Sequence, residues 1–170
     1  MTALKMPKVD KQTLKNKDRI ISDIQAFTKK NNILSEYEEL KPYETDGLAA
    51  YRQTPMLVVL PETTQEVSRI LSYCNKNKIK VVPRGAGTGL AGSALPLADC
   101  ILLGLGKFNK IKEIDFTNRC VVAQPGVTNL SITHAVEHKG FYYAPDPSSQ
   151  MACSIGGNVA ENSGGVHSLK

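Results

Sequence analysis

Residues 81–93 read V-V-P-R-G-A-G-T-G-L-A-G-S, a loop with four glycines that follows a short apolar run. Glycine adopts positive φ without steric penalty and lets successive backbone N–H groups converge on an anion. Leu90 is the one long side chain between the glycines, so a large ligand can approach the backbone closely. The stretch predicts a phosphate or pyrophosphate site, and a mobile surface turn is the alternative interpretation.

The glycine spacing alone does not identify the type of site. Gly87-x-Gly89-x-x-Gly92 matches the dinucleotide fingerprint, which also requires a helix that opens at the third glycine and an acidic residue about 20 positions further on. Pro96 stands where the first turns of that helix would be, and residues 99–103 form a second apolar run instead. No G-x-x-x-x-G-K-[S/T] stretch occurs. The sequence therefore supports neither a Rossmann nor a P-loop site.

The residues around the loop predict an alternation of strands and helices. An apolar strand at 57–60 and the capping pair Thr63-x-x-Glu66 precede a helix, and a strand at 79–84 then delivers the loop to its carboxyl end. Ligands favour that edge of an α/β sheet. Further strands are expected at 100–103, 111–115, 120–124 and 141–143, and a helix is expected from Thr128 to Gly140.

A second glycine cluster occupies residues 144–165. Pro145, Asp146 and Pro147 stiffen a turn, and residues 154–160 predict a short helix whose free N–H groups face an anion. Asn162 to Gly165 add an amide side chain and close backbone approach. Two such clusters, each after a predicted strand, indicate one large ligand held from two sides, and a flavin dinucleotide fits that requirement.

The length and net charge of the chain limit the classes of protein to which it can belong. A chain of 170 residues suits one domain or two small subdomains. Lys+Arg 21 against Asp+Glu 16 gives a net charge of +5, and the excess lies before Gly47 without interleaved aromatic residues. This indicates a solvated, partly disordered leader and no nucleic-acid partner. Because there is neither a signal-peptide core nor a membrane-spanning run, we expect a cytoplasmic protein, with peripheral membrane attachment through partners as an option.

The cysteines and histidines suggest no metal or nucleophile. Cys74, Cys100 and Cys120 are expected to be small buried hydrophobic residues, and Cys153 lies in a polar loop without a linked histidine. Residues 134–138 spell H-x-x-E-H, which on one helix would place two histidines on the same face. Only His167 and Glu161 remain as downstream third ligands, so the sequence predicts no metal.

Three motifs together carry a family resemblance. P-R-G-A-G-T-G-L-A-G at 83–92 and A-P-D-P-S-S-Q-M-A-C-S-I-G-G-N-V-A-E-N-S-G-G at 144–165 resemble the FAD-binding domain of the vanillyl-alcohol oxidase and p-cresol methylhydroxylase superfamily. Y-E-T-D-G-L at 43–48 and Y-R-Q-T-P at 51–55 bring the similarity closest to the FAD subunits of glycolate oxidases, with D-lactate dehydrogenases nearby.

The resemblance implies an α+β fold, namely two α/β subdomains of a PCMH-type FAD-binding domain, the second of them incomplete. Residues 1–53 would then be a basic leader and helical segment, 54–117 the first subdomain and 118–170 the truncated second. It also implies cofactor contacts from both clusters. In the first cluster these are Pro83, Arg84, Gly85, Ala86, Gly87, Thr88, Gly89, Gly92 and Ser93, and in the second they are Pro145, Asp146, Pro147, Ser154, Gly156, Gly157, Asn158, Ala160, Asn162 and Gly164.

The resemblance finally implies a flavoenzyme that oxidises a 2-hydroxy acid such as glycolate or D-lactate. FAD is expected to be non-covalent, because Thr88 stands where one covalent branch of the family has histidine. Electrons would pass to other glycolate oxidase subunits, including an iron–sulfur subunit, or to a quinone. Catalytic residues are expected in a substrate domain beyond Lys170, so the chain alone is expected to be inactive, as a fragment, split-gene product or relic. The alternative is a non-catalytic flavin- or nucleotide-binding module, or an interaction fragment of an oxidase complex.

Overall fold

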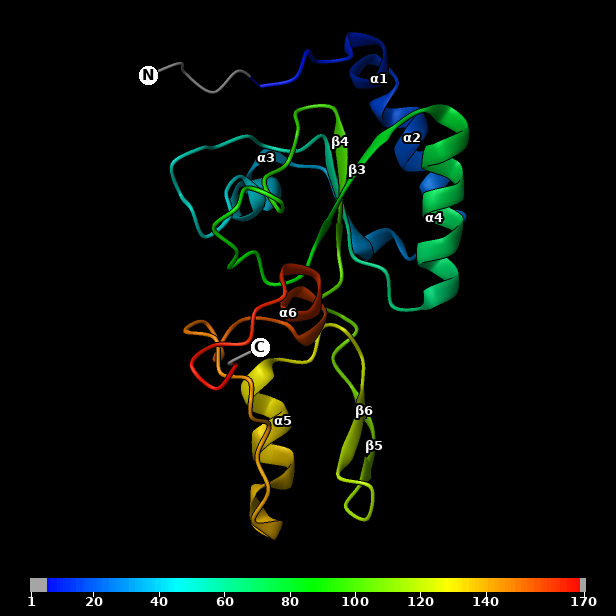
Figure 1. Cartoon of the computed structure of the whole chain (residues 1–170). Helices are drawn as coiled ribbons and strands as arrows, with labels where there is room; N and C mark the ends of the chain where they lie inside the picture. Colours follow the sequence, from blue (N-terminus) through cyan, green and yellow to red (C-terminus); the bar gives the residue numbers. More distant parts are fainter. Residues whose placement is uncertain (1–5, 169–170) are drawn as a thin grey trace.

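The computed structural model of the chain describes residues 6–168. Residues 1–5 and 169–170, with which the expected leader begins and the expected second subdomain ends, lie outside the described residues. Figure 1 shows a four-stranded sheet with helices at one end of the molecule, and a two-stranded hairpin with helix α5 at the other. Helix α6 lies between these two parts (Figure 1), so the middle of the molecule is where elements from both meet.

The four-stranded sheet has the order β1-β2-β4-β3. Its strands are β1 (Ile33–Leu34), β2 (Leu57–Val59), β3 (Lys80–Arg84) and β4 (Cys100–Gly104). β2 and β3 both run parallel to β4, and β1 is antiparallel to β2. β4 is buried along its whole length, as expected for a central parallel strand covered on both faces. The predicted strand–helix–strand unit is present, but β4 separates its two strands.

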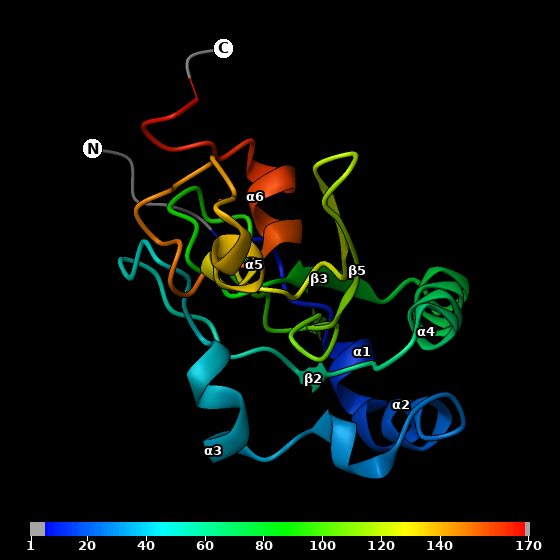
Figure 2. The same cartoon turned by 90° about the horizontal axis from the view of Figure 1, so that it is seen from below.

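Alternate residues of the sheet supply two apolar layers. Leu57, Val59 and Ile101 pack with Ile24 and Ile70 from the helices α2 (Lys17–Ile24) and α4 (Thr64–Asn77). These two helices cover the same face of the sheet (Figures 1 and 2). On the other face, Val58 and Leu102 pack against Leu40 of α3 (Tyr37–Leu40), which is followed by the 3₁₀ turn η2 (Lys41–Tyr43).

The N-terminal segment is folded onto the sheet from Asp10 onward, so the predicted disordered leader is wrong for this part. Asp10 caps α1 (Lys11–Lys15), and its own backbone N–H donates to Asp99 Oδ2 at 2.6 Å. Asp99 is 2% exposed and also pairs with Lys80 at 2.7 Å. A contact across 89 residues of sequence therefore fixes the segment, and no local pattern encodes such a contact.

The start of α4 carries a polar network that ties the N-terminal segment to the sheet. Thr63 accepts from the backbone N–H of Glu66 at 3.1 Å, as predicted. The Glu66 carboxylate does not complete the capping box, because it accepts from Glu62 N and from Thr28 Oγ1 instead. The Glu62 carboxylate accepts from Lys29 at 2.6 Å, from Asn32 at 3.2 Å in the 3₁₀ turn η1 (Lys30–Asn32), and from Lys107 at 3.3 Å. These donors lower the pKa of Glu62 to about 2.

This network predicts acid sensitivity. The pKa of Glu62 falls from 4.5 to about 2 on folding. The stability that its carboxylate contributes is therefore fully present above pH 4.5 and is lost as the pH falls from 4.5 through about 2. We expect Glu62→Gln to lower the melting temperature at neutral pH and to match the wild type near pH 2. Thermal unfolding at both pH values measures this, with exposed Glu113→Gln as the control. A Glu62→Gln deficit that persists unchanged in acid would contradict the assignment.

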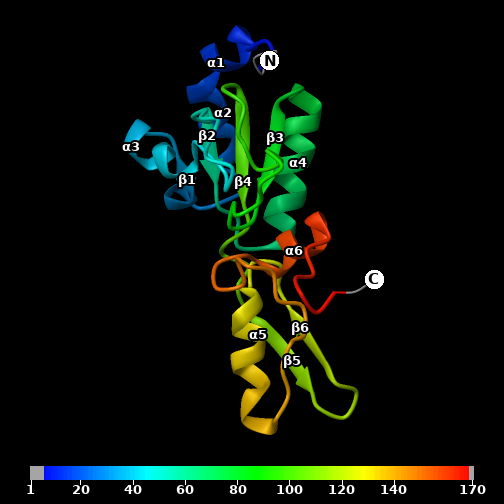
Figure 3. The same cartoon turned by 60° about the vertical axis from the view of Figure 1, so that its left-hand side comes forward.

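The second part of the chain contains a hairpin, two helices and long loops. β5 (Ile111–Asp115) pairs antiparallel with β6 (Cys120–Ala123), so the hairpin spans the expected boundary at residue 117. Helix α5 (Asn129–Val136) begins at the predicted Thr128 cap, and the 3₁₀ turn η3 (Glu137–Lys139) ends at Gly140 with φ +75°. Helix α6 (Ile155–Glu161) follows Ser154, as predicted. Figure 3 shows α5 alongside the hairpin.

Two local predictions for this region need correction. Residues 141–143 are not a strand. Side-chain contacts hold this segment instead of strand pairing: the Phe141 ring packs on Phe116, and Tyr143 N donates to Thr133 Oγ1. Cys120 is exposed rather than buried, whereas Cys74 and Cys100 are buried, which raises the pKa of each thiol to about 11.

The H-x-x-E-H stretch does not form one helical face either. Helix α5 ends at Val136, so His134 lies on the helix whereas His138 lies in η3, where its ring packs on Phe116. Among residues 6–168, no group of three or more His, Cys, Asp or Glu side chains is placed to hold a metal ion. No helix in this range combines the length and apolar character needed to cross a bilayer.

Candidate functional site

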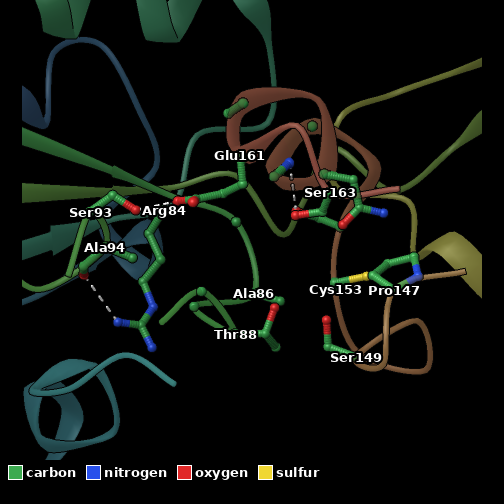
Figure 4. A pocket seen from close by; sticks show the side chains of 18 of the residues that line it. Arg84, Ala86, Thr88, Ser93, Ala94, Pro147, Ser149, Cys153, Glu161 and Ser163 are labelled. Atoms are coloured by element: carbon green, nitrogen blue, oxygen red, sulfur yellow. Dashed lines mark hydrogen bonds between the residues drawn. The ribbon is translucent and has the colours of Figure 1, made fainter. Parts of the chain in front are cut away.

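A cavity of about 770 Å³ lies between the glycine loop and the segment around α6. The loop (residues 85–94) forms one wall, and residues from Pro147 to Ser163 form the other (Figure 4). The loop begins where β3 ends, at the carboxyl edge of the parallel strands, because Arg84 is the last residue of β3 and its carbonyl accepts from Leu105 N at 2.9 Å.

The first wall is backbone with its donors free. Gly87 and Gly92 have φ of +72° and +78°, which favours glycine at both positions. Within the described chain, no backbone N–H of residues 86–93 donates to a protein acceptor. Such groups require partners when they are removed from water, and an anion provides acceptors for several of them at once.

The loop rests on the segment 43–48. A Cβ atom at Gly47 would lie 2.5 Å from the carbonyl oxygen of Thr88 and 2.9 Å from that of Gly89, so only glycine allows this approach. Arg84 also connects these two segments, because its Nη1 donates to Thr45 O at 2.7 Å and to Ala94 O at 3.4 Å. The Y-E-T-D-G-L motif at 43–48, which carried the similarity to FAD subunits of glycolate oxidases, therefore supports the glycine loop by direct contact.

The second wall is the start of α6, fixed against the end of the hairpin. Ser154 caps the helix by accepting from Gly157 N at 3.3 Å, and Gly156 N donates to Pro125 O at 2.8 Å. A Cβ atom at Gly156 would lie 2.6 Å from Pro125 Cβ and 3.0 Å from its carbonyl oxygen. Glycine at 156 is therefore what allows α6 to lie this close to residue 125.

The two walls touch at two points. A Cβ atom at Gly85 would collide with Ser154 Oγ, so the loop and the helix cap are in close contact there. At the other end of the cavity the Ser93 hydroxyl donates to Glu161 Oε1 (Figure 4). Segments about 70 residues apart in sequence therefore enclose a common space, as the two clusters predicted.

Most of the residues predicted to contact the cofactor line this cavity, and five do not. Those that line it are Pro83, Arg84, Gly85, Ala86, Gly87, Thr88, Gly89, Ser93, Pro147, Ser154, Gly156, Gly157, Asn158 and Ala160. Those outside the lining are Gly92, Pro145, Asp146, Asn162 and Gly164.

The five outside the lining have other roles in this structure. Gly92 turns the loop, and Asn162 ends α6 in the left-handed conformation at φ +54°. Pro145 accepts from Asn129 Nδ2 at 2.9 Å. Asp146 accepts from the backbone N–H of His167 at 3.2 Å, which lowers the pKa of its carboxyl, and its own N–H donates to Gly164 O.

Sequence reasoning missed several lining residues. They are Leu90, Ala91, Ala94, Leu105, Pro125, Ser148, Ser149, Cys153, Glu161 and Ser163. Most are direct neighbours of predicted residues, so including whole segments would have found them. Leu105 and Pro125 differ, since each reaches the cavity from the end of another strand. Only the sheet order and the hairpin register place them there.

The residues present fit a flavin dinucleotide. Besides the free N–H groups of the loop, Asn158 contributes a side-chain Nδ2 that is buried and has no acceptor in the described part of the chain. The side chains of the loop are small apart from Leu90, which leaves the cavity open to a large ligand. The cavity size lies within the range usual for cofactor sites.

Residues 55–170 match a family described as FAD binding domain. The chain belongs to this family. The match covers both walls of the cavity, and FAD, predicted from the sequence, is confirmed as the cofactor of the family.

Similarity to curated proteins is high at the sequence level. The chain is 56% identical over 138 residues to glycolate oxidase subunit GlcD of Escherichia coli (strain K12), which covers 81% of this chain and 28% of that protein. It is 33% identical over 158 residues to mitochondrial D-2-hydroxyglutarate dehydrogenase of Arabidopsis thaliana, covering 93% and 28%. The chain thus spans about 28% of the length of these relatives.

The predicted fold class is confirmed by a solved structure. p-Cresol methylhydroxylase with substrate bound superposes with a TM-score of 0.75 at 23% identity, over 91% of this chain and 30% of that one. At this level of identity the likeness concerns the fold alone. The α+β architecture of a PCMH-type FAD-binding domain is therefore shared.

Proposed function

We propose that the chain is the FAD-holding part of a flavoenzyme that oxidises a 2-hydroxy acid, glycolate or D-lactate, to the 2-oxo acid. The observation that carries the proposal is the pair of walls facing one cavity: within residues 6–168, one has backbone donors without a partner and the other has the Asn158 Nδ2 without an acceptor. Similarity to a glycolate oxidase subunit and to a hydroxy-acid dehydrogenase supports the substrate class.

Each wall has a part in the proposed site. The backbone of residues 84–89 would hold the pyrophosphate, with the hydroxyl of Thr88 as a further donor. Ser93, the other hydroxyl expected there, donates to Glu161 in this structure. The lining residues between Pro147 and Ser163 would face the flavin from the other subdomain, Asn158 among them as a donor to a ring or ribitol acceptor. When bound, FAD would accept a hydride from the hydroxy acid. The division into subdomains at residue 117 is part of this proposal.

The proposal includes partners and location. Similarity to a named glycolate oxidase subunit supports further subunits as electron acceptors, with an iron–sulfur subunit as the specific expectation. Cytoplasmic location with peripheral attachment to the membrane through such partners belongs to the same proposal.

The test is flavin content and turnover of the purified chain. We expect it to retain FAD and to release it into the supernatant on acid precipitation, because Thr88 has no nucleophilic nitrogen for a flavin link. Acid that leaves all flavin in the pellet would contradict non-covalent binding, and a chain that takes up no FAD would contradict the site itself.

Turnover by the chain alone is expected to be absent. Oxidation needs a carboxylate clamp and a base within hydrogen-bond reach of the substrate hydroxyl. Of the ionisable side chains in the described lining, Arg84 is bound to carbonyls and Glu161 to Ser93, which leaves only Cys153, and it is buried. Flavin bleaching by glycolate or D-lactate in the isolated chain would show that these residues do more than we assign to them.

A further inference from the structure

Arg84 is a buried cation behind the glycine loop. Its side chain reaches toward Ala94, away from Cys153 and Pro147 on the far wall (Figure 4). The residue is 9% exposed. Its Nη1 donates to the carbonyls of Thr45 and Ala94 and, at 3.5 Å, to that of Tyr43, and its Cζ lies 5.7 Å from the centre of the Tyr43 ring.

All of these partners are neutral. Within residues 6–168 no carboxylate oxygen lies within 4.0 Å of the guanidinium, and Asp46 acts on it only through space. Burial lowers the pKa of Arg84, but an arginine remains charged at neutral pH. A buried charge without a counterion reduces stability unless another group compensates it.

The glycine loop lies directly against this charge at Gly87. A Cβ atom at Gly87 would lie 2.6 Å from Nε of Arg84 and closer still to Cζ and Nη2, so Gly87 rests directly on the guanidinium. The free N–H groups of residues 86–93 lie on the same loop. In a site of low dielectric constant, a charge behind the backbone still attracts an anion in front of it, and salt screens it little.

We propose that Arg84 is a positioning residue for a diphosphate: it fixes the loop and supplies, from behind Gly87, the positive charge that the bound diphosphate neutralises. This rests on the proposed function, and adds that affinity for the diphosphate depends on the charge of Arg84 behind Gly87. Asp46, which lies buried with its Oδ2 unpartnered in the described chain, raises the pKa of Arg84 through space, and its negative charge opposes the positive potential that Arg84 adds at the loop.

Charge and shape can be separated by two variants of opposite expected sign. Arg84→Gln removes the charge but keeps a donor for the carbonyls, and we expect it to weaken ADP binding by about 10- to 100-fold, or about 1.4–2.8 kcal/mol. Asp46→Asn removes the opposing charge at nearly constant shape, and we expect it to tighten ADP binding by about threefold or more. Neither variant should change the affinity for riboflavin, which has no phosphate.

The experiment is calorimetric titration of the full chain with FAD, ADP, inorganic pyrophosphate and riboflavin. Arg52→Gln is the matched control, because it is the same substitution at an arginine that pairs with Glu44 at the surface, with its side chain 70% exposed. We expect this control to bind ADP as the wild type does.

The outcomes are distinguishable. The inference is overturned if Arg84→Gln loses as much affinity for riboflavin as for ADP and Asp46→Asn does not bind ADP more tightly. Arg84 would then have a structural role only, while FAD binding by the wild type would still support the proposed function. If Arg84→Gln does not fold, the sign of the Asp46→Asn effect decides. A wild-type chain that binds none of the four ligands overturns the proposed function and this inference together.

Discussion

Gly87→Glu is expected to abolish FAD retention while the rest of the fold persists. The residue has φ +72°, which costs a non-glycine residue about 1–2 kcal/mol. Its new Cβ would also collide with the Arg84 guanidinium, so the loop would have to move. A side chain at this position would therefore displace Arg84 before it reached the ligand space. Flavin content after purification measures the effect, and we expect at least a hundredfold lower affinity, about 2.8 kcal/mol.

Gly106→Glu is the control for that substitution. It adds the same charge and side chain to an exposed glycine, with no atom within 4 Å of the new Cβ and no positive φ. We expect flavin content and melting temperature equal to those of the wild type. If Gly87→Glu retains as much flavin as the wild type, the glycine loop is not part of the FAD site.

Gly156→Val is expected to disable the second wall. The valine Cβ would lie 2.6 Å from Pro125 Cβ and 3.0 Å from its carbonyl oxygen, and neither is the end of a flexible side chain. Helix α6 must then shift away from Pro125 and lose the bond from Gly156 N. We expect loss of FAD retention with a melting temperature lowered by several degrees, as overpacking costs about 1–3 kcal/mol.

Val159→Ala on the same helix separates this effect from a general weakening of α6. Val159 is 75% exposed and does not line the cavity between the two walls. Its truncation should leave flavin content unchanged. If Gly156→Val also keeps its flavin, α6 is not a wall of the cofactor site.

Local signals predicted the parts of the fold that local forces build. The caps at Thr63, Thr128 and Ser154 each bind the N–H three residues on, as their sequences indicated. Strand β4 was predicted because its residues are apolar without interruption, which a strand buried on both faces requires.

Predictions failed where distant contacts decide. The anchoring of Asp10 on Asp99 spans 89 residues, and Cys120 is exposed because it falls at an exposed position of β6, which its apolar neighbours in sequence do not indicate. The direction of the Arg84 side chain depends on carbonyls about 40 residues earlier. Sequence motifs identified this arginine as part of the site, but only the fold shows that its guanidinium lies behind the loop.

The most direct test is a map of backbone amide shifts on titration of the ¹⁵N-labelled chain with FAD. The account predicts that the largest changes fall on residues 85–93 and 154–163 together, with little change at the tip of the β5–β6 hairpin. Changes confined to one of the two segments, or saturation with FAD that leaves both unchanged, would contradict the claim that these two walls form one cofactor site.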